Sequence, residues 1–193
     1  MMKDFFRSLR ILLIFSVITG AAYPFVMTGL AQFLFPFQAN GSIVKRENKV
    51  MGSILIGQQF SGNGYFHGRP SAVGYNAAAS GASNWGPTNA KLIDAVKERL
   101  VSIRWENPAV ATEPVPADLV LASASGLDPH ISPESAILQA DRIAAVRQIS
   151  KTQVIELIRN QQEARQFGFL GAPRVNVLKL NLALDALEKK YER

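Results

Sequence analysis

A long stretch near the start of the chain carries no charge. From Ile11 to Val44 there is no Lys, Arg, Asp or Glu, and the part up to Phe37 is mostly large and apolar. A bilayer core about 30 Å thick needs roughly 20 apolar residues of helix to cross it. The pattern therefore predicts a transmembrane anchor helix over residues 11–37, preceded by a short tail over residues 1–10.

A cleaved signal peptide is the alternative interpretation of the same segment. Its apolar part would run for only about 7–15 residues and end at a small-x-small cleavage site. Here the apolar run is longer, and the cluster Gly20-Ala21-Ala22 lies in its middle. We therefore expect an uncleaved anchor, bent near Pro24, whose small residues suit contact with other membrane helices.

The basic residues around the anchor predict its orientation. Lys3, Arg7 and Arg10 lie directly before the apolar run, and basic residues close to a membrane hold their end in the cytoplasm. We expect a single-pass protein of the cell (inner) membrane, in contact with lipid, with its N-terminus cytoplasmic and residues 38–193 outside. The absence of Cys fits both compartments and decides nothing.

Four helices are predicted after the anchor, from apolar positions that recur at helical spacing. Three of them begin at a polar residue that can accept the free backbone amides of the first turn. The second helix is expected to continue unbroken to Ile149. The predicted helices begin at Thr88 or Asn89 (with Leu92, Val96, Leu100 and Ile103 along one face), at Ser132 followed by Pro133, and at Ser150 with Gln153 as a capping box, while a C-terminal helix carries Leu180, Leu184, Leu187 and Tyr191.

Short strands are predicted between turn-rich segments. We place them at residues 53–57, 65–66 and 119–121, and at Val175 with Val177. The fold class is therefore α+β: one transmembrane helix, then a single helix-rich extracytoplasmic domain over residues 38–193 with a small sheet. Residues 71–89, dense in Ala, Ser, Gly and Asn, form a loop of a length that is often functional.

Composition excludes several classes of function. The formal charge of +6 is spread among interspersed acidic and basic residues, with no basic run longer than two, so nucleic-acid binding is not expected. The sequence lacks the G-x-x-x-x-G-K-[ST] phosphate loop. With no Cys and only His67 and His130, no zinc or copper site is expected, and we assign no metal ligand.

The first candidate site is the segment Ser125-Gly126-Leu127-Asp128-Pro129-His130. Ser, Asp and His together can form a hydrolase relay, but Ser125 lacks the G-x-S-x-G setting of a nucleophile. The other interpretation is a stiff turn that presents polar groups to a partner, through Ser125, Gly126, Asp128, Pro129 and His130.

The second candidate site is the segment that runs from Ser80 to Asn89. Small residues followed by a helix N-terminus can hold an anion through backbone amides. No Lys or Arg lies within the segment. The alternative is a surface loop fixed by Trp85.

Several segments together resemble one protein family. Besides the stretch from Ser125 to Pro133 they are Gly64-Tyr65-Phe66-x-Gly68-Arg69-Pro70-Ser71, Ser80-Gly81-Ala82-Ser83-Asn84-x-Gly86-Pro87 and Arg174-Val175-Asn176-Val177-Leu178-x-Leu180-Asn181. They resemble the C subunit of the Kdp high-affinity potassium-transporting P-type ATPase of bacteria and archaea, over essentially the whole chain. Trp85 and Thr88 stand where Leu and Ser are more usual.

This resemblance implies a non-catalytic role in potassium transport. Its partners would be a channel-like A subunit, an ATP-hydrolysing B subunit and a small F subunit. The chain would stabilise the assembly and act as a catalytic chaperone that raises the ATP affinity of the B subunit. It would have no cofactor of its own, with ATP bound jointly with the catalytic subunit. The nucleotide contacts would be Ser80, Gly81, Ser83, Asn84, Gly86 and Asn89.

The expected topology conflicts with direct contact to ATP. An exported domain lies across the membrane from cytoplasmic ATP, so its effect on affinity would be transmitted by coupling between sites. Contact with the outer face of the channel-like subunit is physically simpler. The alternative from another class is a membrane-anchored extracytoplasmic hydrolase that uses Asp128 and His130.

Overall fold

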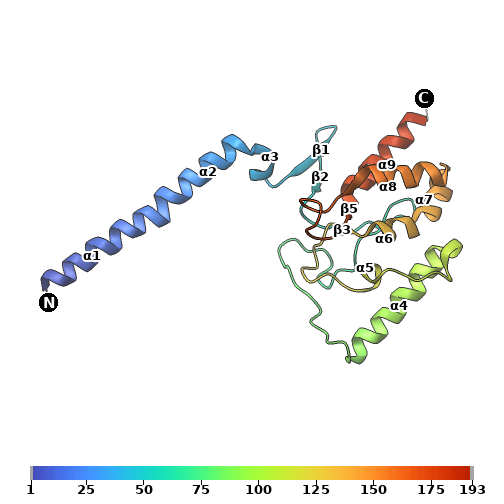
Figure 1. Cartoon of the computed structure of the whole chain (residues 1–193), viewed down its shortest axis with the longest axis horizontal. Coiled ribbons are helices and arrows are strands. Elements are labelled where there is room, and N and C mark those ends of the chain that lie inside the picture. Colours follow the sequence, from blue (N-terminus) through green and yellow to red (C-terminus); the bar gives the residue numbers. More distant parts are fainter. Residues whose placement is uncertain (1, 192–193) are drawn as a thin grey trace. The chain divides into compact units, whose positions relative to one another are not determined.

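The computed structural model describes residues 2–191, and their side chains as far as residue 188 (Figure 1). The chain divides into two compact units, Met1–Ser53 and Ile54–Arg193. The α+β class, with one apolar N-terminal helix, a helix-rich remainder and small sheets, is confirmed.

The first unit begins with a continuous helix from Met2 to Leu34 that is long and apolar enough to cross a membrane. It consists of α1 (Met2–Val17), a π-helical turn η1 (Ile18–Ala22) and α2 (Tyr23–Leu34). Its 33 residues span about 50 Å at 1.5 Å per residue. The helix therefore includes most of the expected tail and stops at Leu34, before the one-turn helix α3 (Pro36–Ala39).

Pro24 is accommodated by the π-helical turn that precedes it. Proline has no amide hydrogen, and its ring crowds the carbonyl four residues earlier. In the wider turn, the amide of Tyr23 bonds to the carbonyl of Ile18, five residues earlier. The helix thus continues through Pro24, with a π-bulge of the kind that inserts one extra residue into a turn.

A β-hairpin that the residue pattern does not predict closes the first unit. Strands β1 (Ile43–Arg46) and β2 (Lys49–Ser53) pair antiparallel. Glu47 and Asn48 join them with φ of 49° and 65°, as a two-residue type I′ turn requires. The strand predicted at residues 53–57 is wrong, because pairing ends at Ser53 and the chain then turns.

The second unit packs helices around a three-stranded antiparallel sheet of order β3-β5-β4. The strands are β3 (His130–Ile131), β4 (Gln162–Glu163) and β5 (Arg174–Asn176). The helices are α4 (Ala90–Glu106), the 3-10 turn η2 (Pro108–Val110), α5 (Ala117–Val120), α6 (Pro133–Leu138), α7 (Ala140–Arg147), α8 (Lys151–Gln161) and α9 (Val177–Tyr191).

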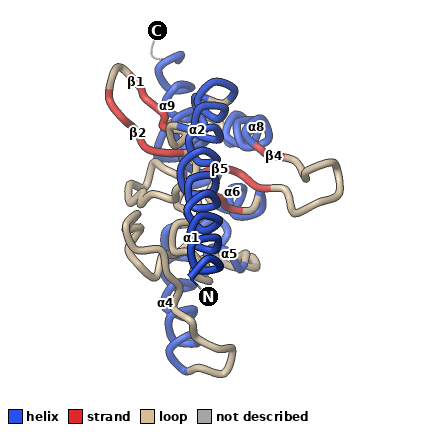
Figure 2. Tube along the Cα trace, turned by 90° about the vertical axis from the view of Figure 1, so that its left-hand side faces the viewer, coloured by secondary structure: helices blue, strands red, loops and turns tan. Residues whose placement is uncertain are grey.

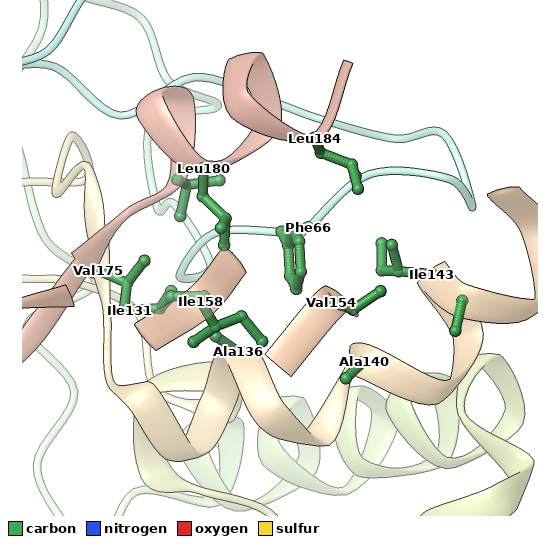
Figure 3. Packing of buried hydrophobic residues seen from close by; sticks show 12 residues of the cluster. Phe66, Ile131, Ala136, Ala140, Ile143, Val154, Ile158, Val175, Leu180 and Leu184 are labelled. Carbon is green, nitrogen blue, oxygen red and sulfur yellow. The ribbon is translucent and has the colours of Figure 1, made fainter. Parts of the chain in front are cut away.

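The core of this unit forms around Phe66, which comes from a loop (Figure 3). Its amide donates to Oδ1 of Asn181 at 2.8 Å, and its carbonyl accepts from Nδ2 of Asn181 at 3.0 Å. The side chain of Asn181 therefore bonds to the amide and carbonyl of Phe66 as the backbone of a paired strand would. The strand predicted at residues 65–66 is wrong for that reason. Figure 3 labels the residues packed with Phe66: Ile131, Ala136, Ala140, Ile143, Val154, Ile158, Val175, Leu180 and Leu184.

The three predicted helix starts are confirmed. Asn89 accepts from the amide of Lys91, and Ser132 from the amide of Ser135. Ser150 forms the expected capping box with Gln153. Polar side chains could be assigned to these starts because a cap is a local interaction.

Three other predictions of secondary structure are wrong. Residues 119–121 are not a strand as predicted: Leu119 and Val120 end the short helix α5, and Leu121 follows it. The second predicted helix does not continue to Ile149 as one element. It is interrupted at Gln139, between α6 and α7. The side chain of Gln139 exchanges two hydrogen bonds with the backbone of His67. Val175 lies in β5 as predicted, but Val177 begins α9.

Candidate functional site

The loop between α5 and α6 is fixed through its own carbonyl groups. The carbonyl of Ser125 accepts from the amide of Gly81 at 2.9 Å. The next two carbonyls, of residues 126 and 127, accept from the hydroxyl of Ser71 at 2.7 Å and from the amide of Gly57 at 2.7 Å. Three segments distant in sequence thus bond to three consecutive carbonyl groups of the loop. These bonds restrain the loop although it has little regular secondary structure.

Two glycines allow this close approach. Gly126 has φ of +68°, and a Cβ there would lie 2.6 Å from Cγ2 of Val73 and 2.7 Å from the carbonyl oxygen of Gly81. A Cβ on Gly57 would lie 2.5 Å from the carbonyl oxygen of Asp128. Both positions require glycine, since backbone atoms cannot yield as a flexible side chain can.

Asp128 lies at the exposed side of this loop and is held by two neighbours. Its Oδ2 accepts from Nη1 of Arg69 at 2.9 Å, and its Oδ1 accepts from the amide of His130 at 3.0 Å. Nδ1 of His130 also lies 3.6 Å from Oδ1. Burial alone would raise the pKa of Asp128, but the hydrogen bonds from His130 and Arg69 outweigh it and lower the pKa to about 2.

The charges continue beyond His130 across the small sheet. Its Nε2 lies 3.7 Å from Oε2 of Glu163. Glu163 in turn accepts from Nε of Arg174 at 3.0 Å and from Nζ of Lys179 at 3.1 Å. Burial would raise the pKa of Glu163, yet the bonds from Arg174 and Lys179 lower it below its ordinary value. Basic and acidic side chains therefore alternate from Arg69 through Asp128, His130 and Glu163 to Lys179.

An open groove of about 490 Å³ runs beside these charges. Asp118 lies in its wall and accepts from the amide and hydroxyl of Ser132 at 2.6 and 3.1 Å, and from the hydroxyl of Ser135 at 2.5 Å. Its carboxylate thus fixes the start of α6. The lining residues are Arg69, Asp118, Asp128, His130, Ile131, Ser132, Ala172, Pro173 and Arg174.

The geometry does not form a serine hydrolase relay. Both ring nitrogens of His130 face carboxylates, whereas a relay needs one of them against a hydroxyl nucleophile. The hydroxyl of Ser125 accepts from the amide of Leu127, and that of Ser132 is engaged with Asp118. In the part of the chain that the structure describes, no serine hydroxyl is bonded to His130.

The residues expected at the nucleotide fall into two groups. Ser80 and Gly81 both bond to the carbonyl of Ser125, at 3.1 and 2.9 Å, so the two candidate loops meet there. Asn89 accepts from the amide of Lys91 at 2.9 Å and so caps α4. Ser83, Asn84 and Gly86 lie in the irregular segment between these points, where Asn84 has a φ of 54°.

Sequence reasoning missed the partners of Asp128 and His130. Arg69 stands in the motif around Gly68 and Pro70, but nothing in its spacing places it 59 residues away against Asp128. Glu163 and Arg174 come from the two strands β4 and β5, which were not both predicted. Pairing of β4 with β5 brings Glu163 and Arg174 together, and Glu163 lies beside His130.

A second polar cluster surrounds Arg142. Arg142 is almost fully buried and donates to Oδ1 of Asn107 at 3.2 Å, to Oε1 of Gln139 at 2.8 Å and to the carbonyl of Tyr65 at 3.1 Å. His67 lies near it, 3.3 Å from Glu106. Burial first, and then the charge of Arg142, lower the pKa of His67. These contacts fix the loop that carries Phe66.

The described residues combine one helix that is long and apolar enough to cross a membrane with an α+β domain whose charged side chains are bonded to one another. A sequence model of the family described as KdpC, K+-transporting ATPase, c chain, matches residues 5–186. The chain belongs to this family.

Curated relatives agree over nearly their whole length. Proteins described as the potassium-transporting ATPase KdpC subunit are 55% identical in Methylococcus capsulatus, over 97% of this chain and 100% of the relative, and 52% identical in Mycobacterium bovis, over the same shares. The relative in Burkholderia cenocepacia is 51% identical over 98% of this chain and 100% of its own length. The chain is an accessory subunit of the pump, not the catalytic one.

Proposed function

We propose that the chain stabilises the potassium-uptake complex and raises the ATP affinity of its ATP-hydrolysing subunit, with the loop from Ser125 to Pro133 as a contact surface. The observation that carries the proposal is the clamping of three consecutive carbonyl groups of this loop by three distant segments. A rigid loop can present Asp128 and His130 to a partner at little cost in conformational entropy.

The proposed topology places this surface outside the cytoplasm. The helix from Met2 to Leu34 would span the membrane, with Lys3, Arg7 and Arg10 at its cytoplasmic end. The partner of the loop is then the outer face of the channel-like A subunit. An effect on ATP, which is bound by the B subunit, is carried by coupling between the two sites. The B and small F subunits complete the proposed complex.

Joint binding of ATP is the competing proposal. It assigns the nucleotide to Ser80, Gly81, Ser83, Asn84, Gly86 and Asn89. Two amides that an anion would use already have partners, since the amide of Gly81 donates to the carbonyl of Ser125 and the amide of Lys91 donates to Oδ1 of Asn89. Contact with a protein partner therefore agrees better with the geometry.

The test compares two aspartates in the whole complex. Asp128 and Asp141 have similarly exposed side chains, 29% and 26%, and each bonds to one cationic side chain. We expect Asp128→Asn to reduce recovery of the complex with a tagged chain and to raise the KM for ATP. Asp141→Asn, which loses the ion pair between Asp141 of α7 and Lys151 of α8, is the control and should leave both unchanged.

Two results would contradict this proposal. Equal recovery and equal KM for the two variants would remove the loop as the contact surface. A reporter fused after Arg193 that is active in the cytoplasm would overturn the exported topology and favour direct binding of ATP.

A further inference from the structure

The hairpin of β4 and β5 ends in a narrow apolar tip, residues 166–170. The amide of Gln166 donates to the carbonyl of Leu170 at 3.0 Å, and the amide of Leu170 donates back at 2.9 Å. Figure 2 shows the loop between β4 and β5 extending away from the rest of its unit. The side chains of Phe167 and Phe169 are 87% and 70% exposed, so the tip presents two aromatic rings to its surroundings.

Phe167 is also in an unfavourable backbone conformation. Its φ is +52°, and Gly168 follows with +83°. The left-handed region suits Gly, Asn and Asp, whereas a bulky residue there is a true outlier. Neither backbone preference nor packing among the described residues favours a phenylalanine here. Backbone strain is concentrated at functional sites, and exposed apolar groups are candidates for contact with a partner or a membrane.

The length of the linker and the charge of the hairpin both indicate a lipid surface. Only 19 residues, 35–53, lie between Leu34, at the end of the apolar helix, and Ile54, where the second unit begins. An extended chain of that length reaches roughly 70 Å, and the hairpin β1–β2 shortens it. A domain tethered this way stays close to the bilayer.

The charged residues of the β4–β5 hairpin and of its base are mostly basic. Arg165, Arg174 and Lys179 outnumber Glu163, which bonds to the last two. Aromatic and aliphatic side chains beside arginine are typical of segments that lie in the interface of a membrane with anionic lipid.

We propose that the tip inserts Phe167, Phe169 and Leu170 into the headgroup region of the membrane that holds the anchor helix, with Arg165 at the level of the phosphates. The proposal rests on the membrane anchoring proposed above. It gives the second unit a second attachment to the bilayer, and so restricts its rotation about the tether.

The absence of cysteine from the sequence permits a direct test. The full chain carrying Phe169→Cys is labelled with the fluorophore NBD and reconstituted in nanodiscs of phosphatidylcholine and phosphatidylglycerol. We expect a blue-shifted emission that doxyl-labelled lipids quench. The matched control is Trp105→Cys, at an aromatic residue of α4 that is 80% exposed, whose label should show neither change.

A second variant separates lipid contact from folding. Phe167→Asn, added to the Phe169→Cys chain, relieves the backbone strain and removes one inserted ring. We expect it to reduce the quenching by doxyl lipid without lowering the Tm of the domain. Quenching that stays at the level of the single-cysteine chain would contradict insertion through this tip.

Failure of the anchoring is recognised separately, because the chain would then not elute with the nanodiscs. A chain that does elute with them, but whose Phe169→Cys label is not quenched, would overturn the proposal. A blue shift that appears only when the other pump subunits are present, without quenching by doxyl lipid, would assign the tip to a protein pocket and overturn it as well.

Discussion

Nη1 of Arg69 and Oδ2 of Asp128 lie 2.9 Å apart, although 59 residues separate them in sequence. The pair connects the segment after the core residue Phe66 to the loop proposed as the contact surface. Both side chains are about one quarter exposed, so solvent screens the pair only in part. The ion pair therefore matters for the stability of the domain and for the shape of the contact surface.

Stability should depend on this pair in a pH-dependent way. The pKa of Asp128 falls from 3.8 to about 2 on folding, so its stabilisation is present above pH 3.8 and is lost as the pH falls through 2. We expect Asp128→Asn to lower the free energy of unfolding by about 1–2 kcal/mol at pH 7, after allowance for screening. Urea unfolding at several pH values measures this. A difference between wild type and variant that grows on acidification would contradict it.

Substitution of Gly126 should destabilise the domain strongly. In Gly126→Ala the new Cβ meets Val73 and the carbonyl of Gly81 at 2.6 and 2.7 Å, at a φ of +68°. The left-handed conformation alone costs roughly 1–2 kcal/mol, and the displacement of backbone adds to it. Thermal unfolding should show a lower Tm than for Gly86→Ala, the control, since a Cβ at Gly86 meets nothing within 4 Å. Equal Tm values would show that the loop can move away.

Phe167→Asn should be neutral or stabilising, which is unusual for removal of a large apolar residue. The folded state gains because asparagine tolerates a φ of +52°, by up to about 1 kcal/mol. Phe169→Asn is the matched control, since Phe169 is similarly exposed but has no positive φ. Denaturant unfolding of the two variants checks the prediction. A loss of stability confined to Phe167→Asn would mean that the ring packs on its own domain.

Asn181→Leu should be among the most damaging substitutions in the core. It leaves the amide and carbonyl of Phe66 without the partners that now lie at 2.8 and 3.0 Å, at a cost of about 2–4 kcal/mol for two buried groups. Asn160→Leu, at an exposed position of α8, is the control. Amide hydrogen exchange at Phe66 gives a second measurement, because loss of protection there should accompany the loss of stability.

The sequence could predict features set by neighbouring residues. The apolar helix follows from composition, and the starts at Asn89, Ser132 and Ser150 follow from caps that act within one turn. The loop around Asp128 could be chosen as a candidate site because Ser125, Asp128 and His130 lie close together in sequence. The predictions of an unbroken second helix and of a strand at residues 65–66 failed where a distant side chain bonds to the backbone, as Gln139 does to His67 and Asn181 to Phe66.

The candidate site could not be completed from the sequence for the same reason. Arg69 and Glu163 reach the row of charges only through tertiary packing and the pairing of β4 with β5. The sequence around Gly57 predicts only a turn. Its close contact with the backbone of Asp128 is visible only in the folded structure. Long-range proximity leaves no spacing in the sequence to recognise.

The bonds between Phe66 and Asn181 also set the order in which the domain can be built. They join residues 115 positions apart. The core around Phe66 therefore lacks the packing of Leu180 and Leu184 until α9 has been synthesised. At 5–20 residues per second, a nascent chain waits on the order of ten seconds for that segment. During this time the loop with Phe66 is open to proteases and chaperones. A messenger truncated shortly before α9 would therefore yield an anchor with an unfolded domain, which quality control can remove before it competes for a place in the pump.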